Sequence, residues 1–453
     1  MISSTDAVAA GRVLPLRRNP VATGPDAPND LPVAQAAGVF ANLITHSTQG
    51  AFASSQAKNL ILKIGDHCDM ARINLRSRSA GIFTAICMLA TTPPLAAAGE
   101  LAPSDIAAAM LRQDAIRGVY EVIEAPDLDT VFVASTPSFD DGTPGFVDLL
   151  SAKDLELKGR IELPRRAFAL GLDHKRGKLF VGSTLDGSLS ILDAKTGALQ
   201  DTVQLGRKDD DGFEHTRMIE VDEESGKVFV SSPSTAGTLW IVDADKGNAV
   251  QRIDNAGLWA AGLAHDPASG RVYVSGGGTK EILIVDGSSG ERIGNFSTGD
   301  TTNEEPDASR HFFVNLALDG KGRRLFAADA NSGQLYVFGT QSGNVLKVVP
   351  IGKGTLDVIY AEAFDQIFVT YRGADRENPH GTGGIVMLGG EHYAELTRIP
   401  LAAHPNSLAI GDHGKALLVT VKAPMEKTHP EYRENATDSV LRIDLEKLSA
   451  LAH

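Results

Sequence analysis

The strongest constraint on this chain is a phrase that returns along its length. It reads RGKLFVGSTLDGSLSILDAKTGALQDTV from Arg176, SGKVFVSSPSTAGTLWIVDADKGNAVQRI from Ser225 and SGRVYVSGGGTKEILIVDGSSGERIGNF from Ser269. Further copies begin at Lys321 and, more loosely, near Asp127, Phe364 and His413. Alignment places one apolar residue per copy at an equivalent position, at spacings of 48, 49, 44, 53, 42 and 50 residues: Phe132, Phe180, Phe229, Tyr273, Phe326, Phe368 and Leu418. This periodicity predicts a repeat architecture rather than separate domains of ~150 residues each.

Each copy has the same internal order of segments. An apolar run such as FALGLDH is followed by a Gly-Lys or Gly-Arg turn, then KLFVGS, a variable loop, SLSILDA, a Thr-Gly or Ser-Gly turn and a last short strand. Four short strands in such a period describe the blade of a β-propeller. The runs are apolar at consecutive positions because a blade packs on both faces. Aspartates that recur where the inner strands end are predicted to shape turns through their side chains: Asp173, Asp222, Asp266, Asp319 and Asp412.

The fold class that follows is an all-β, seven-bladed propeller of four-stranded antiparallel blades, spanning residues 99–453. A single blade cannot bury both of its faces, so the ring has to close. The last copy has no fourth strand, whereas MLRQDAI (Met110 to Ile116) precedes the first inner strand. We predict that this N-terminal segment is the outer strand of the seventh blade. The alternative interpretation of 104–112 is a short helix that begins at Ser104.

A leader pattern precedes the repeats. From Met70 the chain reads MARINLRSRSAGIFTAICMLATTPPLAAAGE, with a basic head, a short apolar centre and small residues at 96–98. This is typical of a signal peptide, so we interpret 70–98 as the leader of an exported, periplasmic protein. Residues 1–69 would then be a mis-annotated upstream or disordered extension, with Met70 as the true start. The alternative for the apolar run is a short buried helix. Later runs are too short for membrane insertion.

Charge and cysteines narrow the chemistry. Residues 1–98 contain eight Lys/Arg and five Asp/Glu, which is a net charge of +3. Since the whole chain has a net charge of −14, residues 99–453 have a net charge of −17. An acidic body is a poor prior for nucleic-acid binding, which depends on Lys and Arg, although local patches can override a global sign. Cys68 and Cys87 both precede residue 99. Disulfides, cysteine metal sites and a cysteine nucleophile are therefore excluded from the propeller.

In a propeller, the loops that enter the inner strands and the loops between second and third strands meet on one face, around the central channel. Loops on a rigid scaffold often carry ligand contacts. We therefore expect the ligand site on this face. Its candidate residues are Arg117, Tyr120, Arg166, His215, Arg217, Trp259, Arg310, His311, Phe312, His404, Asn406 and Lys422, with Arg165 and Asp357 at the same level.

Structural interpretations stand beside this one. An arginine or histidine here can bind loop carbonyls and hold blades together, the acidic runs at 209–211 and 304–307 can neutralise the arginines, and Trp259 can fill a gap between blades instead of stacking on a base or sugar. His215, His311 and His404 lie on alternate blades and would suit zinc or copper if they met at the axis. No HxH, HxxxH or CxxC spacing supports that site. We expect no metal and no other cofactor.

The repeats FVGSTLDGSLSILDAKTG, VYVSGGGTKEILIVDGSSG and VFVSSPSTAGTLWIVDADKG resemble YVTN-type (WD40-like) propeller repeats. RHFFVNLALDGKGRRLFAADANSGQLYVFGTQSGNVL from Arg310, HPNSLAIGDHGKALLVTVK from His404 and the opening MLRQDAIRGVYEV resemble the periplasmic YncE-like proteins, and the likeness spans residues 105–445. The resemblance implies a secreted or periplasmic seven-bladed propeller that binds single-stranded DNA and has no established catalysis. The chain departs from the family in longer insertions at 371–384 and 422–438 and in its negative charge.

Three function classes follow. The first is a monomeric, non-catalytic binding protein for an anionic ligand; if this is single-stranded DNA, Arg166, Arg217, Arg310 and Lys422 would meet phosphates, and Trp259, Tyr120 or Phe312 would stack on bases. The second is an enzyme of lactonase-like or metal-dependent type, for which the sequence offers Asp357 with His311 or His404 as acid and base. The third is a protein-interaction platform, with the loops 371–384 and 422–438 as contact surface. Fold alone does not choose among them.

Overall fold

The computed structural model describes residues 13–14 and 102–451, except 139, 141, 210–211, 247, 375–379, 402–403 and 425–426. The leader expected at 70–98 and nearly all of the extension expected at 1–69 lie outside the described residues. In the described part, none of the helices is long and apolar enough to cross a bilayer.

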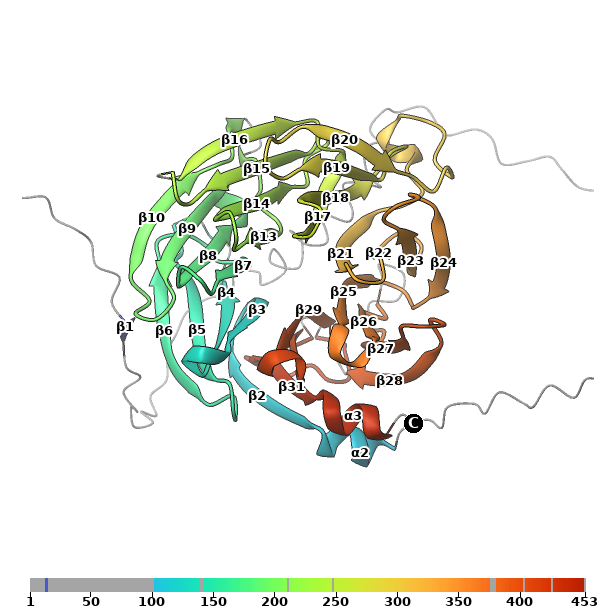
Figure 1. Cartoon of the computed structure of the whole chain (residues 1–453). Coiled ribbons are helices and arrows are strands. Elements are labelled where there is room, and N and C mark those ends of the chain that lie inside the picture. The colour runs from blue at the N-terminus through green and yellow to red at the C-terminus, as the bar shows by residue number, and fades with distance from the viewer. Residues whose placement is uncertain are drawn as a thin grey trace, which may run out of the picture.

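Seven four-stranded antiparallel blades stand in a ring around an open axis, which confirms the predicted fold (Figure 1). From the channel outward, the blades of the first half are β3 (Val119–Ala125), β4 (Thr130–Ser135), β5 (Gly145–Ser151) and β6 (Leu157–Leu163); β7 (Ala169–Asp173), β8 (Lys178–Ser183), β9 (Ser188–Asp193) and β10 (Leu199–Gln204); β13 (Ile219–Asp222), β14 (Lys227–Ser232), β15 (Thr238–Asp243) and β16 (Ala249–Asp254).

The remaining blades are β17 (Leu258–Asp266), β18 (Arg271–Gly277), β19 (Ile282–Asp286) and β20 (Arg292–Phe296); β21 (Phe313–Asp319), β22 (Arg324–Asp329), β23 (Gln334–Gly339) and β24 (Val345–Pro350); β25 (Thr355–Ala361), β26 (Gln366–Tyr371), β27 (Gly383–Gly389) and β28 (Glu395–Leu401); β29 (His404–Gly411), β30 (Ala416–Lys422), β31 (Asp438–Asp444) and β2 (Met110–Ile116). A small hairpin, β11 (Lys208–Asp209) and β12 (Gly212–Phe213), follows the second blade, and β1 (Val13–Leu14) pairs with β6.

The hydrophobic core is divided into seven clusters, each of which lies between two adjacent blades. The aligned apolar residue of every repeat, from Phe132 to Leu418, has no exposed surface. It pairs with the inner strand of its own blade and packs in one of these clusters, so it contributes to both the sheet and the blade contact. This position explains why an aromatic or large aliphatic residue recurs in every copy.

The ring is closed as predicted. β2 pairs antiparallel with β31, from Met110 opposite Ile443 to Ile116 opposite Asp438. Asp438 reinforces this junction because its carboxylate accepts hydrogen bonds from the backbone N–H groups of Gly118 (2.8 Å), Val119 (2.9 Å) and Ala423 (2.8 Å). The first and the seventh blades are therefore tied together by a strand and by a side chain.

Both chain ends of the propeller carry a short helix. α2 (Pro103–Ala108) precedes β2, and α3 (Leu445–Leu451) follows β31; Ile106 packs with Leu445 and Leu448 (Figure 1). The predicted strand at Met110–Ile116 is therefore confirmed, and the helix of the alternative interpretation is present only before it. Ser104 is not the helix cap, because Pro103 occupies the first turn and no side chain caps it.

The aspartate turns are confirmed in four of the five blades. Asp173 Oδ1 accepts the N–H of Arg176 at 2.8 Å, and Asp319 Oδ1 accepts that of Gly322 at 2.8 Å; Asp222 and Asp266 make equivalent bonds. Asp412 differs: it has a left-handed φ of 48° and binds Arg442 instead. Short 3-10 turns lie at Pro126–Leu128, Thr184–Asp186, Pro306–Ala308, Glu362–Phe364 and Asp412–Gly414.

Candidate functional site

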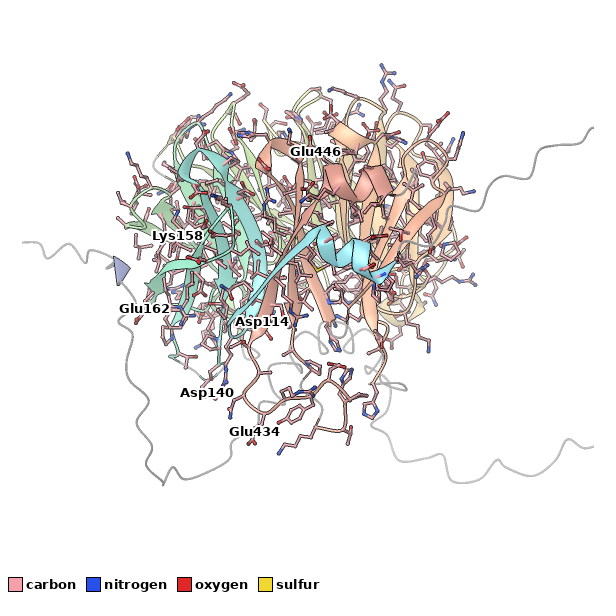
Figure 2. The ribbon with its side chains drawn as sticks, turned by 90° about the horizontal axis from the view of Figure 1, so that it is seen from below. Asp114, Asp140, Lys158, Glu162, Glu434 and Glu446 are labelled. Carbon is pink, nitrogen blue, oxygen red and sulfur yellow. The ribbon has the colours of Figure 1, made fainter. Side chains whose placement is uncertain are left out.

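A cavity of about 520 Å³ lies in the central channel and is lined by the inner strands of all seven blades. Seen edge-on, the ring has two unlike sides: Asp140 and Glu434 lie in loops on one side, and Glu446 of α3 lies on the other (Figure 2). The inner strands begin on the first of these sides, which is the face predicted to carry the site. We call its opening the channel mouth, defined by Tyr120, Arg372 and Lys422.

Irregular inner strands aim polar side chains into this cavity. In five blades the pairing of the inner strand with its neighbour shifts register near the mouth, as between Val119 and Val122 in β3 and between Thr355 and Val358 in β25. Such bulges leave residues outside the ladder and redirect their side chains. Glu121 and Asp357 lie in these two bulges and face the cavity.

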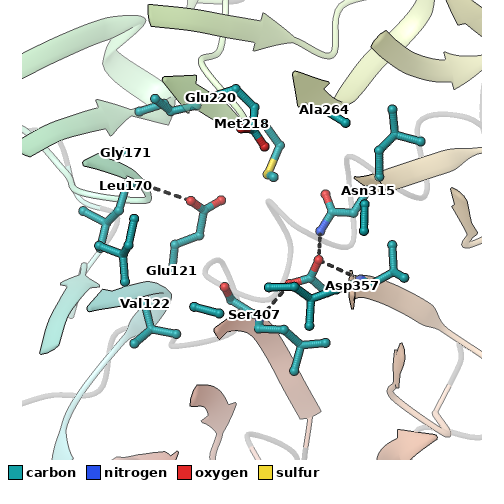
Figure 3. A pocket seen from close by; sticks show the side chains of 18 of the residues that line it. Glu121, Val122, Leu170, Gly171, Met218, Glu220, Ala264, Asn315, Asp357 and Ser407 are labelled. Atoms are coloured by element: carbon teal, nitrogen blue, oxygen red, sulfur yellow. Dashed lines mark hydrogen bonds between the residues drawn. The ribbon is translucent and has the colours of Figure 1, made fainter. Parts of the chain in front are cut away.

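Three carboxylates line the cavity, and their surroundings differ (Figure 3). Asp357 is fully satisfied: it accepts hydrogen bonds from Asn315 Nδ2 (2.7 Å) and from the N–H groups of Val358 (2.8 Å) and Leu408 (2.7 Å). Glu121 accepts from the Leu170 N–H at 2.9 Å and pairs with Arg217 Nη1 at 3.1 Å.

Glu220 is the third carboxylate, and within the described residues it has neither a hydrogen bond nor an ion pair. Burial, together with the nearby charge of Glu121, raises the pKa of Glu220 to about 8. Burial also raises the pKa of Glu121 to about 7, against the opposing effect of Arg217. Burial raises the pKa of Asp357 as well. Removing carboxylates from water favours their protonated form, and Glu220 has no cation to offset that cost.

The channel mouth has the opposite charge. Lys422 Nζ lies 3.6 Å from the centre of the Tyr120 ring, whose neighbour is Phe168 at 4.0 Å between centroids. Burial and the charge of Arg372 lower the pKa of Lys422 to about 8, although Asp438 opposes the shift. Burial and the charge of Arg217 lower the pKa of Arg372 to about 10. Cations that repel one another at such a mouth favour the arrival of an anion.

The guanidinium of Arg372 is incompletely satisfied. Its Nε is buried, and the described part of the chain offers this atom no hydrogen-bond acceptor. Arg372 lies in the insertion between β26 and β27, for which the repeats give no equivalent position, and the sequence analysis did not select it. The same cations, with burial as the main cause, lower the pKa of the neighbouring His404 to about 4.

The structure brings six of the sequence-derived candidates to the cavity or its mouth: Tyr120, Arg217, Asp357, His404, Asn406 and Lys422. Arg217 is 9% exposed and bridges Glu121 and Asn315. Asn406 donates to the Tyr120 carbonyl at 3.4 Å. These contacts make Arg217 and Asn406 part of the wall of the channel.

Other candidates are held by neighbours. Arg166 is buried and pairs with Asp186 at 3.1 Å, and Arg165 binds Gln204 at 2.7 Å. Arg117 is exposed and donates to the Asn435 carbonyl, while Arg310 is exposed at the start of the fifth blade. The side chains of Arg117, Arg165 and Arg166 therefore make contacts that hold loops and blades in place, as the structural interpretation expects.

The aromatic pair Trp259 and Phe312 serves packing between blades. Their rings meet edge to face at 5.7 Å, and both belong to the hydrophobic cluster that joins the fifth and sixth blades. Phe312 is 2% exposed and leaves no face for a base, whereas Trp259 is partly exposed. Trp259 also has a left-handed φ of 54°, so its position is set by the turn as well as by its ring.

The three histidines of the metal alternative do not form one site. His311 is 4% exposed and bonds Asp329 Oδ2 at 2.8 Å; burial opposes protonation, but this carboxylate raises the pKa of His311 overall. His215 is partly buried elsewhere on the mouth face. Across the described residues, no three side chains of the His, Cys, Asp and Glu types come together as metal ligands.

The acid–base arrangement of the enzyme alternative is not assembled either. The carboxylate of Asp357 already accepts hydrogen bonds from three donors, and the Nδ1 of His311 is hydrogen-bonded to Asp329. No hydrogen bond joins Asp357 to His311 or to His404 among the residues that the structure describes. The sequence analysis also missed Glu121, Met218, Glu220 and Asn315. The register of the repeats offered a signal for most of them. In each blade one inner-strand residue pairs with the repeat's aligned apolar residue, and the position two residues before it carries Glu121, Met218, Asn315 or Asp357 in four blades. Two other blades have Ala169 or Gly262 at that position.

No model of a known protein family matches the chain. It is 26% identical over 339 residues to a protein of Escherichia coli (strain K12) described as uncharacterized protein YncE, with 74% of this chain and 91% of that protein covered. The same values hold for the YncE protein of Salmonella typhi.

Solved structures that share the architecture include the RRP9 WD40 repeats, with a TM-score of 0.56 at 13% identity over 74% of this chain and 97% of that one. Hydrazine synthase of Kuenenia stuttgartiensis superposes with a TM-score of 0.50 at 17% identity, over 63% of this chain and 78% of that one. At these identities the likeness concerns the fold alone.

Proposed function

Because this chain is a YncE-like β-propeller, we propose that it is an exported binding protein that holds an anionic ligand at the channel mouth without transforming it. One observation carries the proposal: Arg372 lies close enough to Lys422 for its charge to lower the pKa of that lysine, and the Arg372 Nε lacks an acceptor within the described residues. Lys422 Nζ already donates to the Val119 carbonyl at 2.5 Å. A phosphate or carboxylate between the two cations would accept a hydrogen bond from the Arg372 Nε and a further charge-assisted bond from the Lys422 ammonium.

Single-stranded DNA is one source of such an anion. The acidic body argues against a long footprint, and both faces of the Tyr120 ring are approached, by Lys422 and by Phe168. We therefore propose that one or two phosphates reach the mouth, without the extended base stacking that single-strand binding proteins use. A small phosphate or carboxylate would meet the same two side chains.

The test is a titration of the purified protein with two probes, a fluorescently labelled oligo(dT) and an alkyl phosphate, over a range of salt concentrations. We expect affinity to fall as salt rises, with a slope of roughly one or two ions released, since few phosphates are engaged. The double variant R372Q/K422Q is expected to lose tenfold or more in affinity. K195Q, which changes an exposed lysine on the opposite face, is the matched control.

Binding that does not depend on salt, or that survives R372Q/K422Q, would contradict the anion site. Binding of the alkyl phosphate but not of oligo(dT) would assign the mouth to small ligands. Binding of oligo(dT) alone would favour nucleic acid.

Export has a separate test. We expect the protein recovered from the periplasm of the native host to begin at Gly99, because cleavage follows the small residues at 96–98. Mass spectrometry of the intact protein and of its N-terminal peptide measures this. A peptide from upstream of Met70 in the exported protein would overturn the proposed start.

A protein-interaction platform is the second candidate function. The insertions after β26 and β30 contact each other, since Thr428 Oγ1 lies 2.6 Å from His380 Nε2 and the rings of His380 and His429 meet edge to face at 6.3 Å. The second insertion carries Glu434, which lies below the ring in Figure 2. Two insertions joined in this way would suit a protein partner that covers the channel.

A further inference from the structure

Glu220 lies deeper in the channel than the cationic mouth, because its strand β13 begins at Ile219, just after Arg217, and runs away from the mouth. Of the other ionisable side chains that line the cavity, Glu121 is paired with Arg217 and Asp357 is held by three donors. Glu220 alone of the three carboxylates has no donor among the described residues. Glu220 is partly buried in the channel wall, and a carboxylate that is removed from bulk water without a hydrogen-bond donor is costly unless a ligand supplies the partner.

The wall between the two charged levels is mixed, but its charged groups are already paired, as Glu121 is with Arg217. Val122, Leu170 and Met218 supply its apolar part, and the Met218 sulfur points toward the open axis in Figure 3. Thioether and aliphatic side chains of this kind adapt to an alkyl chain. The channel thus presents cations at its mouth, a mixed section whose charged groups have partners, and an unpaired acid below.

We propose that the channel takes a dipolar ligand, whose anionic end meets Arg372 and Lys422 and whose protonated amine or guanidinium binds Glu220. This inference rests on the proposed function, because the anionic end uses the same two cations. It adds the chemical class of the ligand: a small molecule with a phosphate or carboxylate at one end and an organic cation at the other, joined by an aliphatic spacer.

The raised pKa of Glu220 agrees with this assignment. Glu121 and Asp357 face the same cavity with negative charge, whereas Arg217 offers positive charge. His265 also lines the cavity, but burial lowers its pKa and favours the neutral imidazole. A bound ammonium would stabilise the ionised Glu220, so binding should release a proton near neutral pH. A ligand without the cation gives no such release.

The experiment uses three homologous series, each with two to six methylene groups: ω-aminoalkyl phosphates, alkyl phosphates and alkylamines. Affinities are measured by calorimetry for the wild type, E220Q, R372Q/K422Q and E156Q, the last being an exposed glutamate that serves as control. Circular dichroism shows whether each variant is folded.

We expect one length of aminoalkyl phosphate to bind at least tenfold more tightly than the matching alkyl phosphate. E220Q should abolish this advantage and leave the alkyl phosphate unchanged, while E156Q changes neither. R372Q/K422Q should weaken the binding of both the aminoalkyl phosphate and the alkyl phosphate, and leave the binding of the alkylamine unchanged. The weak binding of the alkylamine should be lost in E220Q.

If alkyl phosphates bind but the amino group adds nothing, or if its advantage survives E220Q, the dipolar ligand is overturned and the anion site stands. If no phosphate binds, the proposed function fails. Amine binding that E220Q removes would then leave only a cation site at the acid.

Discussion

Deleting residues 102–116 is expected to abolish the cooperative unfolding transition of the propeller. The deletion removes β2, which leaves the outer edge of β31 unpaired, and it removes Ile106 and Ile116 from two of the seven clusters between blades. A ring of repeats has no stable open form when the closing contact is lost, because every blade depends on its neighbours. Chemical denaturation monitored by circular dichroism and by tryptophan fluorescence measures the effect.

A pair of point variants on the same strand separates closure from general damage. Ile116 is 1% exposed, and I116A is expected to lower the free energy of unfolding by ~2–5 kcal/mol. Leu111 is 43% exposed, and L111A should change it by less than ~0.5 kcal/mol. Equal effects of the two variants, or a deletion that unfolds like the wild type, would contradict the closing role of β2.

Replacing Glu220 by glutamine is expected to stabilise the protein at high pH and not at low pH. The pKa of Glu220 rises from 4.5 in the unfolded chain to about 8 in the folded protein. A raised pKa stabilises the folded state fully below pH 4.5, and this contribution is lost as the pH climbs through 8. Glu121, whose pKa is about 7, adds to the same trend.

The gain for E220Q at pH 9 is expected to be on the order of 2 kcal/mol, less than the full shift implies at ~1.4 kcal/mol per pKa unit, because the cavity admits water. Thermal melts at pH 4 and pH 9 measure the difference, with E156Q as control. An equal effect at both pH values would show that Glu220 is not a strained acid. A loss of stability at pH 9 would show that an unseen cation pairs with it.

The fold could be predicted because the sequence of each repeat contains the signals of a complete blade. Apolar runs, turn residues and the period of the phrase all describe one blade, and the missing fourth strand of the last copy indicated where Met110–Ile116 must pair. The helix α3 was not foreseen, although the sequence carries its start signal: Asp444 ends β31 and caps the helix, since its Oδ1 accepts the Lys447 N–H at 3.0 Å.

The site was accessible only in part. Position near the start of an inner strand identified Tyr120, Arg217 and Asn406, but it could not show which side chains neighbouring residues would already hold, such as Arg166 by Asp186 and His311 by Asp329. Glu121 reaches the channel through a bulge, and a bulge depends on pairing that a single strand does not display. Arg372 comes from an insertion outside the repeat.

The pairing of β2 with β31 also fixes an order of folding. Met110–Ile116 is synthesised before any blade, whereas its partner Asp438–Asp444 follows the other six blades and most of the seventh. The outward hydrogen-bonding position that β2 will occupy therefore does not exist until β31 has been made. Closure is for this reason a late step in assembling the ring, and a chain that stops before residue 438 cannot make it.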